Sequence, residues 1–184
     1  RRPMHGIHLS RLPFSAKVFC SLFLLGIGCG ALAAFTQAAT AVGVSPAAVR
    51  ESLAPELPMT GMHHGETSGE REMDLAELSR TAKVWMRTPL LIQTSHTHLF
   101  GQTLIAGLLG LIFLFVPLRE GPKAAIVALP FVGTLVDIGG MWATRFVSPS
   151  LSVLVIAGGT LFALGYVLIA ALSMHDLWLR KETA

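Results

Sequence analysis

The chain has 184 residues, of which 52% are hydrophobic and only 14% are charged. This composition is too apolar and too poor in charge for an ordinary soluble domain. The formal net charge of +3 needs no nucleic acid to explain it, because anionic lipid is an available partner for basic residues at a membrane.

Four apolar runs are long enough to cross a bilayer as helices. A helix satisfies its backbone hydrogen bonds within the segment, as a lipid environment requires. The sequence therefore predicts an all-α integral membrane four-helix bundle. The predicted order is a basic N-terminus (1–17), a span (18–40), a long loop (41–95), a span (96–118), a turn (119–123), a span (124–145), a turn (146–150), a span (151–174) and a tail (175–184).

The distribution of charge predicts the orientation of these spans. One side of the predicted bundle carries more basic than acidic residues, and short basic loops are typical of the cytoplasmic side. We therefore expect both termini in the cytoplasm, the loop 41–95 in the periplasm, and a multi-pass protein of the bacterial inner membrane. The basic residues on the predicted cytoplasmic side are Arg1, Arg2, Arg11, Lys17, Arg119, Lys123, Arg180 and Lys181, with Glu120, Asp176 and Glu182 as the acids.

The first apolar run follows a basic lead and so resembles a secretory signal peptide. We expect it to be kept as a signal anchor and to form the first span. Gly26, Gly30 and Ala34 recur at a spacing of four, which predicts a face of small residues for close helix packing.

Both cysteines, Cys20 and Cys29, lie in the same run and cannot pair with each other on one helix. We expect them to be small buried side chains. The sequence has no Cys-x-x-Cys-His, so it carries no attachment signal for a c-type haem.

The loop 41–95 divides into two parts. Residues 45–69 are rich in Pro, Gly and Ser and are expected to be mostly irregular. Residues from about 70 to 88 have apolar positions at helical spacing, which predicts an amphipathic helix lying at the membrane surface. Within the first part, His63 and His64 stand near methionines and an acid, so they are candidate copper or zinc ligands; a solvated loop is the alternative.

Polar residues at one end of two spans form the main candidate site. His96, His98 and Gln102 open the second span, and Asp137 with Met141 lies in the third. Two antiparallel spans joined by a short turn are usually neighbours, so His98, Gln102 and Asp137 are expected to meet on the periplasmic side. Polar groups inside a membrane cost free energy and usually have a function. His96 is about 200° around the helix from His98 and cannot share one site with it if the helix is regular.

Several interpretations of this cluster stay open. A b-type haem would need His98 or His96 as one axial ligand, with Met141 or a loop histidine as the other. A quinone needs only a histidine and a carboxylate that can exchange protons with its oxygen atoms. The polar groups can also bond one another and set the register of two helices, or bind another ligand.

Two stretches resemble known membrane proteins. Ser95-His-Thr-His-Leu-Phe-Gly101 resembles the helix entrances of the haem–copper oxidase and nitric oxide reductase superfamily. Together with Asp137-Ile-Gly-Gly-Met-Trp142 it resembles uncharacterised four-span bacterial membrane proteins associated with respiratory cytochromes. The resemblance implies an electron-transfer setting and nominates His96 or His98 as a haem ligand. Four spans without further histidines for a haem–copper centre exclude a terminal oxidase.

These observations predict a small membrane subunit of a bacterial respiratory or photosynthetic electron-transfer complex, with a periplasmic-side haem b or quinone site. It would act as a non-catalytic or electron-transfer subunit and contact larger membrane subunits, lipid and a periplasmic c-type cytochrome. The alternatives are a structural or assembly subunit without a cofactor, and a protein that handles copper or zinc.

Overall fold

The computed structural model describes residues 8–54 and 88–180, and this part of the chain is helical, without strands. Four long helices are long and apolar enough to cross a membrane, by length and composition. Three short helical segments flank them. The long helices are α1 (Phe14–Ala41), α4 (Thr88–Phe113), α5 (Glu120–Phe146) and α6 (Ser152–Trp178); the short ones are η1 (Leu9–Arg11), α2 (Pro46–Leu53) and η2 (Pro149–Leu151).

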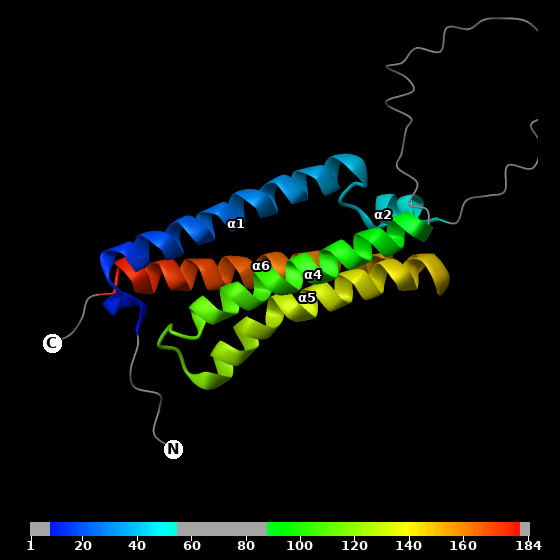
Figure 1. Cartoon of the computed structure of the whole chain (residues 1–184). Coiled ribbons are helices and arrows are strands. Elements are labelled where there is room, and N and C mark those ends of the chain that lie inside the picture. The colour runs from blue at the N-terminus through cyan, green and yellow to red at the C-terminus, as the bar shows by residue number, and fades with distance from the viewer. Residues whose placement is uncertain (1–7, 55–87, 181–184) are drawn as a thin grey trace, which may run out of the picture.

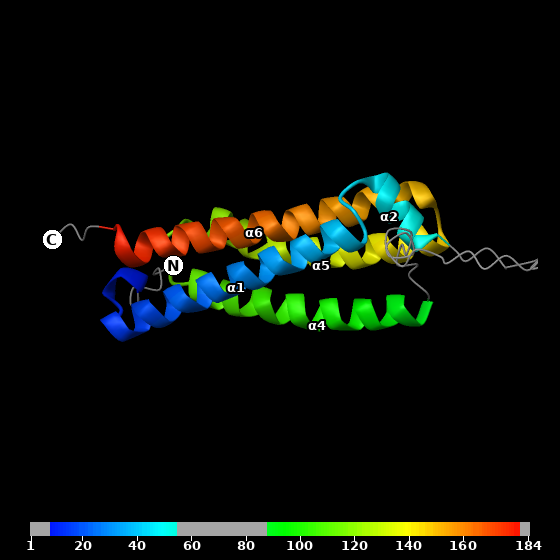
Figure 2. The same cartoon turned by 90° about the horizontal axis from the view of Figure 1, so that it is seen from above.

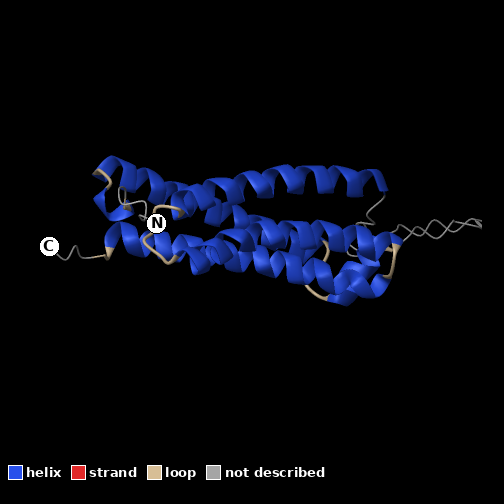
Figure 3. Ribbon diagram, turned by 90° about the horizontal axis from the view of Figure 1, so that it is seen from below, coloured by secondary structure: helices blue, strands red, loops and turns tan. Residues whose placement is uncertain are grey.

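Helices α4, α5 and α6 lie side by side and form the body of the structure (Figures 1 and 2). Helix α1 lies near α6 where α1 begins and diverges from it toward its other end. The start of α1, the α4–α5 turn and the end of α6 share one end of the molecule, called here the N/C end. Helix α2 lies at the opposite end, the α2 end, and the described chain consists of helices and short connections (Figure 3).

The contact between α5 and α6 depends on glycines. A Cβ atom on Gly158 of α6 would overlap the backbone of Asp137 on α5, and one on Gly133 of α5 would lie 2.8 Å from the Gly158 carbonyl oxygen. A Cβ atom on Gly165 would lie 2.6 Å from Cδ of Pro130. Small residues of this kind let two helix backbones approach closely, which supports helix association inside a membrane.

Helix α1 is held by fewer contacts. The Tyr166 hydroxyl of α6 donates a hydrogen bond of 2.7 Å to the Leu24 carbonyl of α1, and Gly28 makes room for this hydroxyl. Beyond this point α1 is largely exposed. The face of small residues that includes Gly26 and Gly30 packs on no other described part of this chain, because a Cβ atom on either glycine would meet nothing within 4 Å.

The exposed surface of the long helices is apolar. Phe19, Leu25 and Leu135 are each more than 60% exposed. Leu24 and Leu109, by contrast, are buried in the apolar core at the N/C end. A surface of this kind suits lipid rather than water. Cys20 is buried as expected, but Cys29 is exposed.

The chain between α1 and α2 turns sharply at Gly43. Its φ angle is +96°, in the left-handed region that glycine adopts without steric cost, and its N–H donates to the Ala38 carbonyl at the end of α1. Ser45 then caps α2 by accepting from the Ala48 N–H, and Pro46 occupies the first turn. A helix therefore stands where irregular structure was expected.

The helix boundaries also differ from the predicted spans. Helix α4 begins at Thr88 rather than at 96, because Pro89 lies in its first turn, where a missing N–H costs nothing. Helix α5 includes most of the predicted turn 119–123, since Glu120 and Pro122 both suit a first helical turn. Helix α6 continues four residues past 174 to Trp178. The predicted surface helix at about 70–88 lies almost wholly outside the described residues.

The first prediction concerns the α5–α6 contact. Gly158→Ala should destabilise the protein by about 1–3 kcal/mol, because the added methyl group must displace the backbone of α5. Gly159→Ala is the matched control: it lies beside Gly158, and a Cβ atom there meets nothing within 4 Å. The free energies of unfolding of both variants in detergent micelles test this. Equal losses would contradict the proposed contact.

Candidate functional site

The face of α4 that turns toward α5 changes from polar to apolar along its length. Near the α2 end it carries Ser95, His98 and Gln102, which follow one another at spacings of three and four and so share a face. Toward the N/C end the same stripe continues with Ala106, Leu109 and Phe113, all fully buried. The apolar half packs as a core, so the polar half is the part of this face that is available for chemistry.

Asp137 of α5 lies opposite this polar half. Its side chain is only 10% exposed, and its backbone is pressed against Gly158 of α6. The carboxylate is therefore fixed between two neighbouring helices. A buried carboxylate needs hydrogen-bond donors or an opposite charge, because transfer out of water otherwise costs several kcal/mol.

His98 and Asp137 come close but form no hydrogen bond. The distance between His98 Nδ1 and Asp137 Oδ2 is 3.9 Å, which is beyond hydrogen-bond length. His98 Nδ1 and Gln102 Oε1 are both buried atoms without a hydrogen-bond partner in the described structure. Two buried polar atoms one helical turn apart on α4 thus lack partners, and one of them lies near the Asp137 carboxylate without bonding to it. The His98 side chain as a whole is 42% exposed, so the cluster opens at the surface of the helices.

A further polar contact joins the same two helices nearer the α2 end. The Trp142 indole nitrogen of α5 donates a hydrogen bond of 2.8 Å to the Ser95 hydroxyl of α4. Neither residue was predicted as part of the site. The signal was present in the spacing of Ser95, His98 and Gln102, which places all three on one face.

The other predicted residues lie elsewhere. His96 is exposed and packs against the Phe100 ring in a tilted arrangement, with ring centroids 4.9 Å apart, on a different face from His98. Met141 is buried in an apolar cluster with Val49, Leu53 and Leu91. A haem held between Met141 and either histidine stays a prediction.

No metal cluster of three or more His, Cys, Asp or Glu residues occurs within 8–54 and 88–180. The predicted metal ligands His63 and His64 lie outside these ranges, so their candidacy stays a prediction.

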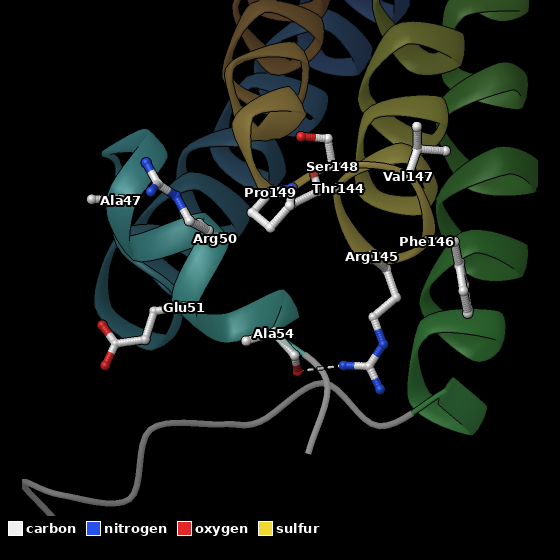
Figure 4. Close-up of a pocket in the computed structure, with 10 residues that line it drawn as sticks. All are labelled: Ala47, Arg50, Glu51, Ala54, Thr144, Arg145, Phe146, Val147, Ser148 and Pro149. Atoms are coloured by element: carbon white, nitrogen blue, oxygen red, sulfur yellow. Dashed lines mark hydrogen bonds between the residues drawn. The ribbon is translucent and has the colours of Figure 1, made fainter. Parts of the chain in front are cut away.

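Arg145 connects α2 to the end of α5. Its Nη1 atom donates to the carbonyl oxygens of Leu53, at 3.0 Å, and Ala54, which are the last carbonyls of α2 (Figure 4). Such carbonyls lack partners within their own helix, and a cation complements the negative end of the helix dipole. An open cavity of about 500 Å³ lies between α2 and the α5–η2 turn beside this guanidinium.

Four candidate spans, an apolar surface and a polar cluster buried between two of the spans define an α-helical membrane protein. The chain belongs to the Aq_1264_TM family, a family of transmembrane helical domains whose model matches residues 86–184. The matched region includes α4, α5 and α6 and therefore the whole His98–Gln102–Asp137 cluster. No curated protein and no solved structure matches the chain significantly.

The second prediction concerns Arg145. Arg145→Met keeps the length of the side chain but leaves the final carbonyls of α2 without their donor. Hydrogen exchange at the amides of Val49 and Leu53 should then become roughly tenfold faster, as expected for the loss of a hydrogen bond to a charged group. Arg50→Met is the control, since Arg50 is an exposed residue of α2 itself. Unchanged exchange in Arg145→Met would show that this contact does not hold α2.

Proposed function

We propose that this chain is a small integral membrane subunit of a bacterial electron-transfer complex and that its His98–Gln102–Asp137 cluster binds a quinone. The observation that supports the proposal is the set of unsatisfied polar atoms between α4 and α5. His98 Nδ1 lies 3.9 Å from Asp137 Oδ2, and Gln102 Oε1 is buried one helical turn away without a partner. A ligand that both donates and accepts hydrogen bonds could supply partners to His98 Nδ1 and Gln102 Oε1 beside the Asp137 carboxylate.

A bound oxygen atom suits the gap between His98 and Asp137. The 3.9 Å between His98 Nδ1 and Asp137 Oδ2 is too long for a direct hydrogen bond, and an oxygen atom beside the pair could bond to both. A buried polar atom without a partner costs about 1–3 kcal/mol. A ligand that supplies the missing hydrogen bond removes this cost and therefore binds more tightly. A quinol hydroxyl can donate to the Gln102 amide oxygen, and the oxygen of either a quinone or a quinol can accept from His98 Nδ1. The apolar ring and tail remain compatible with the surrounding lipid.

The residues of the cluster differ in what they contribute. An imidazole can donate a proton at one ring nitrogen and accept one at the other, so His98 is suited to exchange protons with a bound oxygen. Asp137, held between α5 and α6, would orient the imidazole and balance its charge when protonated. Gln102 would position the ligand through its amide. A quinone supplies the two-electron redox chemistry when bound; the chain supplies the binding groups and the proton path.

The partly exposed side of His98 gives a route of entry. Its side chain is 42% exposed on a molecule whose surface is largely apolar, and quinones move within the lipid phase. A ligand can therefore reach the imidazole from the membrane without opening the α5–α6 contact.

The distribution of charge supports an orientation in the bacterial inner membrane. Among the described residues, the N/C end carries Arg11, Lys17, Arg119, Lys123 and Arg180 against Glu120 and Asp176, whereas the α2 end carries Arg50 and Arg145 against Glu51. The more basic end belongs in the cytoplasm by the positive-inside rule. In this orientation both termini are cytoplasmic, and the cluster faces the periplasm, where a c-type cytochrome can approach the complex.

A structural subunit without a cofactor is the second candidate. It is favoured by Gly26 and Gly30, whose small faces point into open space within this chain and leave room for a helix of a larger subunit. In that case the polar cluster would set the register of α4 against α5. A metal-handling protein is the third candidate and depends on His63 and His64 alone.

The third prediction separates the first two candidates. His98→Ala should leave the complex assembled and lower its quinol-linked turnover at least tenfold, because a positioned acid or base contributes on that scale or more. Asp137→Asn keeps the shape of the carboxylate and should also lower turnover. His96→Ala is the matched control, since its imidazole lies on another face of the same helix. Full turnover in both site variants would favour the structural subunit.

The fourth prediction concerns orientation. In a variant with Cys20 and Cys29 replaced by Ala, a cysteine at the exposed position Ser150 should react with a membrane-impermeant reagent in cells with a permeable outer membrane. A cysteine at the exposed position Gly121 should react only after the inner membrane is opened. The reverse pattern would contradict the proposed orientation.

A further inference from the structure

The first turns of α1 meet the last turn of α6 at a tryptophan. The Trp178 indole nitrogen donates a hydrogen bond of 2.9 Å to the Ser21 hydroxyl, and the Phe14 ring packs edge-on with a centroid distance of 6.1 Å. The Lys17 ammonium stands over the Trp178 ring, 5.9 Å from its centroid. A cation is thus held against an aromatic surface at the ends of two candidate spans.

Lys17 differs from two other cations at the N/C end. Lys123 Nζ lies 3.6 Å from a Glu120 carboxylate oxygen and also donates to the Leu114 carbonyl, and Arg180 pairs with Asp176 at 3.2 Å. Within the described ranges, the Lys17 ammonium pairs with no carboxylate. The cation–π contact contributes about 0.5–2 kcal/mol but does not neutralise the charge.

The surroundings of Lys17 favour an anion from the membrane. The residue is half-buried, so its ammonium has lost part of its water and gains from a negatively charged partner. Tryptophan and lysine near the end of a span lie at the level of the lipid headgroups. Directly beside them, Phe14, Phe19 and Leu22 are each more than 60% exposed and offer an apolar surface to acyl chains.

We propose that Lys17 and Trp178 form a binding site for the headgroup of an anionic phospholipid, with the lipid phosphate against the Lys17 ammonium. The Ser21 hydrogen bond fixes the orientation of the indole, and the indole in turn positions the ammonium. The acyl chains then run along the exposed apolar side of α1, which few protein contacts cover. This site is independent of the His98–Gln102–Asp137 cluster, which lies nearer the α2 end.

Native mass spectrometry of the full-length protein, with phosphatidylglycerol and phosphatidylcholine as probes, tests the site. The wild type should retain phosphatidylglycerol in preference to phosphatidylcholine. Lys17→Gln should weaken phosphatidylglycerol binding about fivefold, as expected for one basic residue at an anionic lipid surface. Lys17→Arg should keep most of the binding, because it keeps the charge over the indole.

Lys123→Gln is the matched control, because it removes one positive charge from the same end of the molecule. The Lys123 ammonium already has two partners, the Glu120 carboxylate and the Leu114 carbonyl. Its phosphatidylglycerol binding should match that of the wild type. Equal losses in Lys17→Gln and Lys123→Gln would show a general charge effect and overturn the site, as would unchanged binding in Lys17→Gln. Displacement of the lipid by excess inorganic phosphate would also overturn it, because the proposed site requires the apolar part of the lipid.

Discussion

The structure depends on the close approach of α5 and α6. Inside a membrane the hydrophobic effect does not drive one apolar helix against another, so association relies on packing and on polar contacts. Gly133, Gly158 and Gly165 bring the two backbones within contact distance, and Gly158 meets the backbone of Asp137 itself. Asp137, the acid well inside α5, therefore also lies at a point of close contact with α6.

The α4–α5 contact is of a different kind, and the difference explains where a ligand can bind. Toward the N/C end Ala106, Leu109 and Phe113 are fully buried and leave no unpaired polar group. Toward the α2 end the polar part of the contact consists of the Ser95–Trp142 hydrogen bond and the cluster of His98, Gln102 and Asp137, while Leu91 and Met141 share an apolar cluster. One half of α4 thus anchors the helix, while the other half holds polar groups at a fixed spacing. This division allows a polar site to persist without loosening the bundle.

Much of the architecture could be predicted from the sequence. The features that could not be predicted share one physical cause. Uncharged runs gave the four spans because length and apolarity are properties of each segment alone. The proximity of His98 to Asp137 followed from the short turn between two antiparallel helices. Which glycine faces which helix could not be predicted, because it depends on the rotation of each helix about its axis. For that reason Gly28, rather than Gly26 or Gly30, receives Tyr166, and Met141 faces α2 rather than a histidine. Helix α2 was missed although Ser45 and Pro46 are a common helix start.

The central claim is that His98, Gln102 and Asp137 act together on one ligand. Calorimetric titration of a short-chain benzoquinol, kept reduced under nitrogen, into the protein tests this most directly, because its hydroxyl groups can donate to the Gln102 amide oxygen. The protein is purified in mild detergent with the subunits that accompany it. Replacing Gln102 by leucine removes the buried amide oxygen while keeping a side chain of similar size. The account predicts saturable binding by the wild type and an affinity at least tenfold weaker in Gln102→Leu, on the scale of a buried polar contact. No saturable binding by the wild type, or equal affinity in the two proteins, would contradict it.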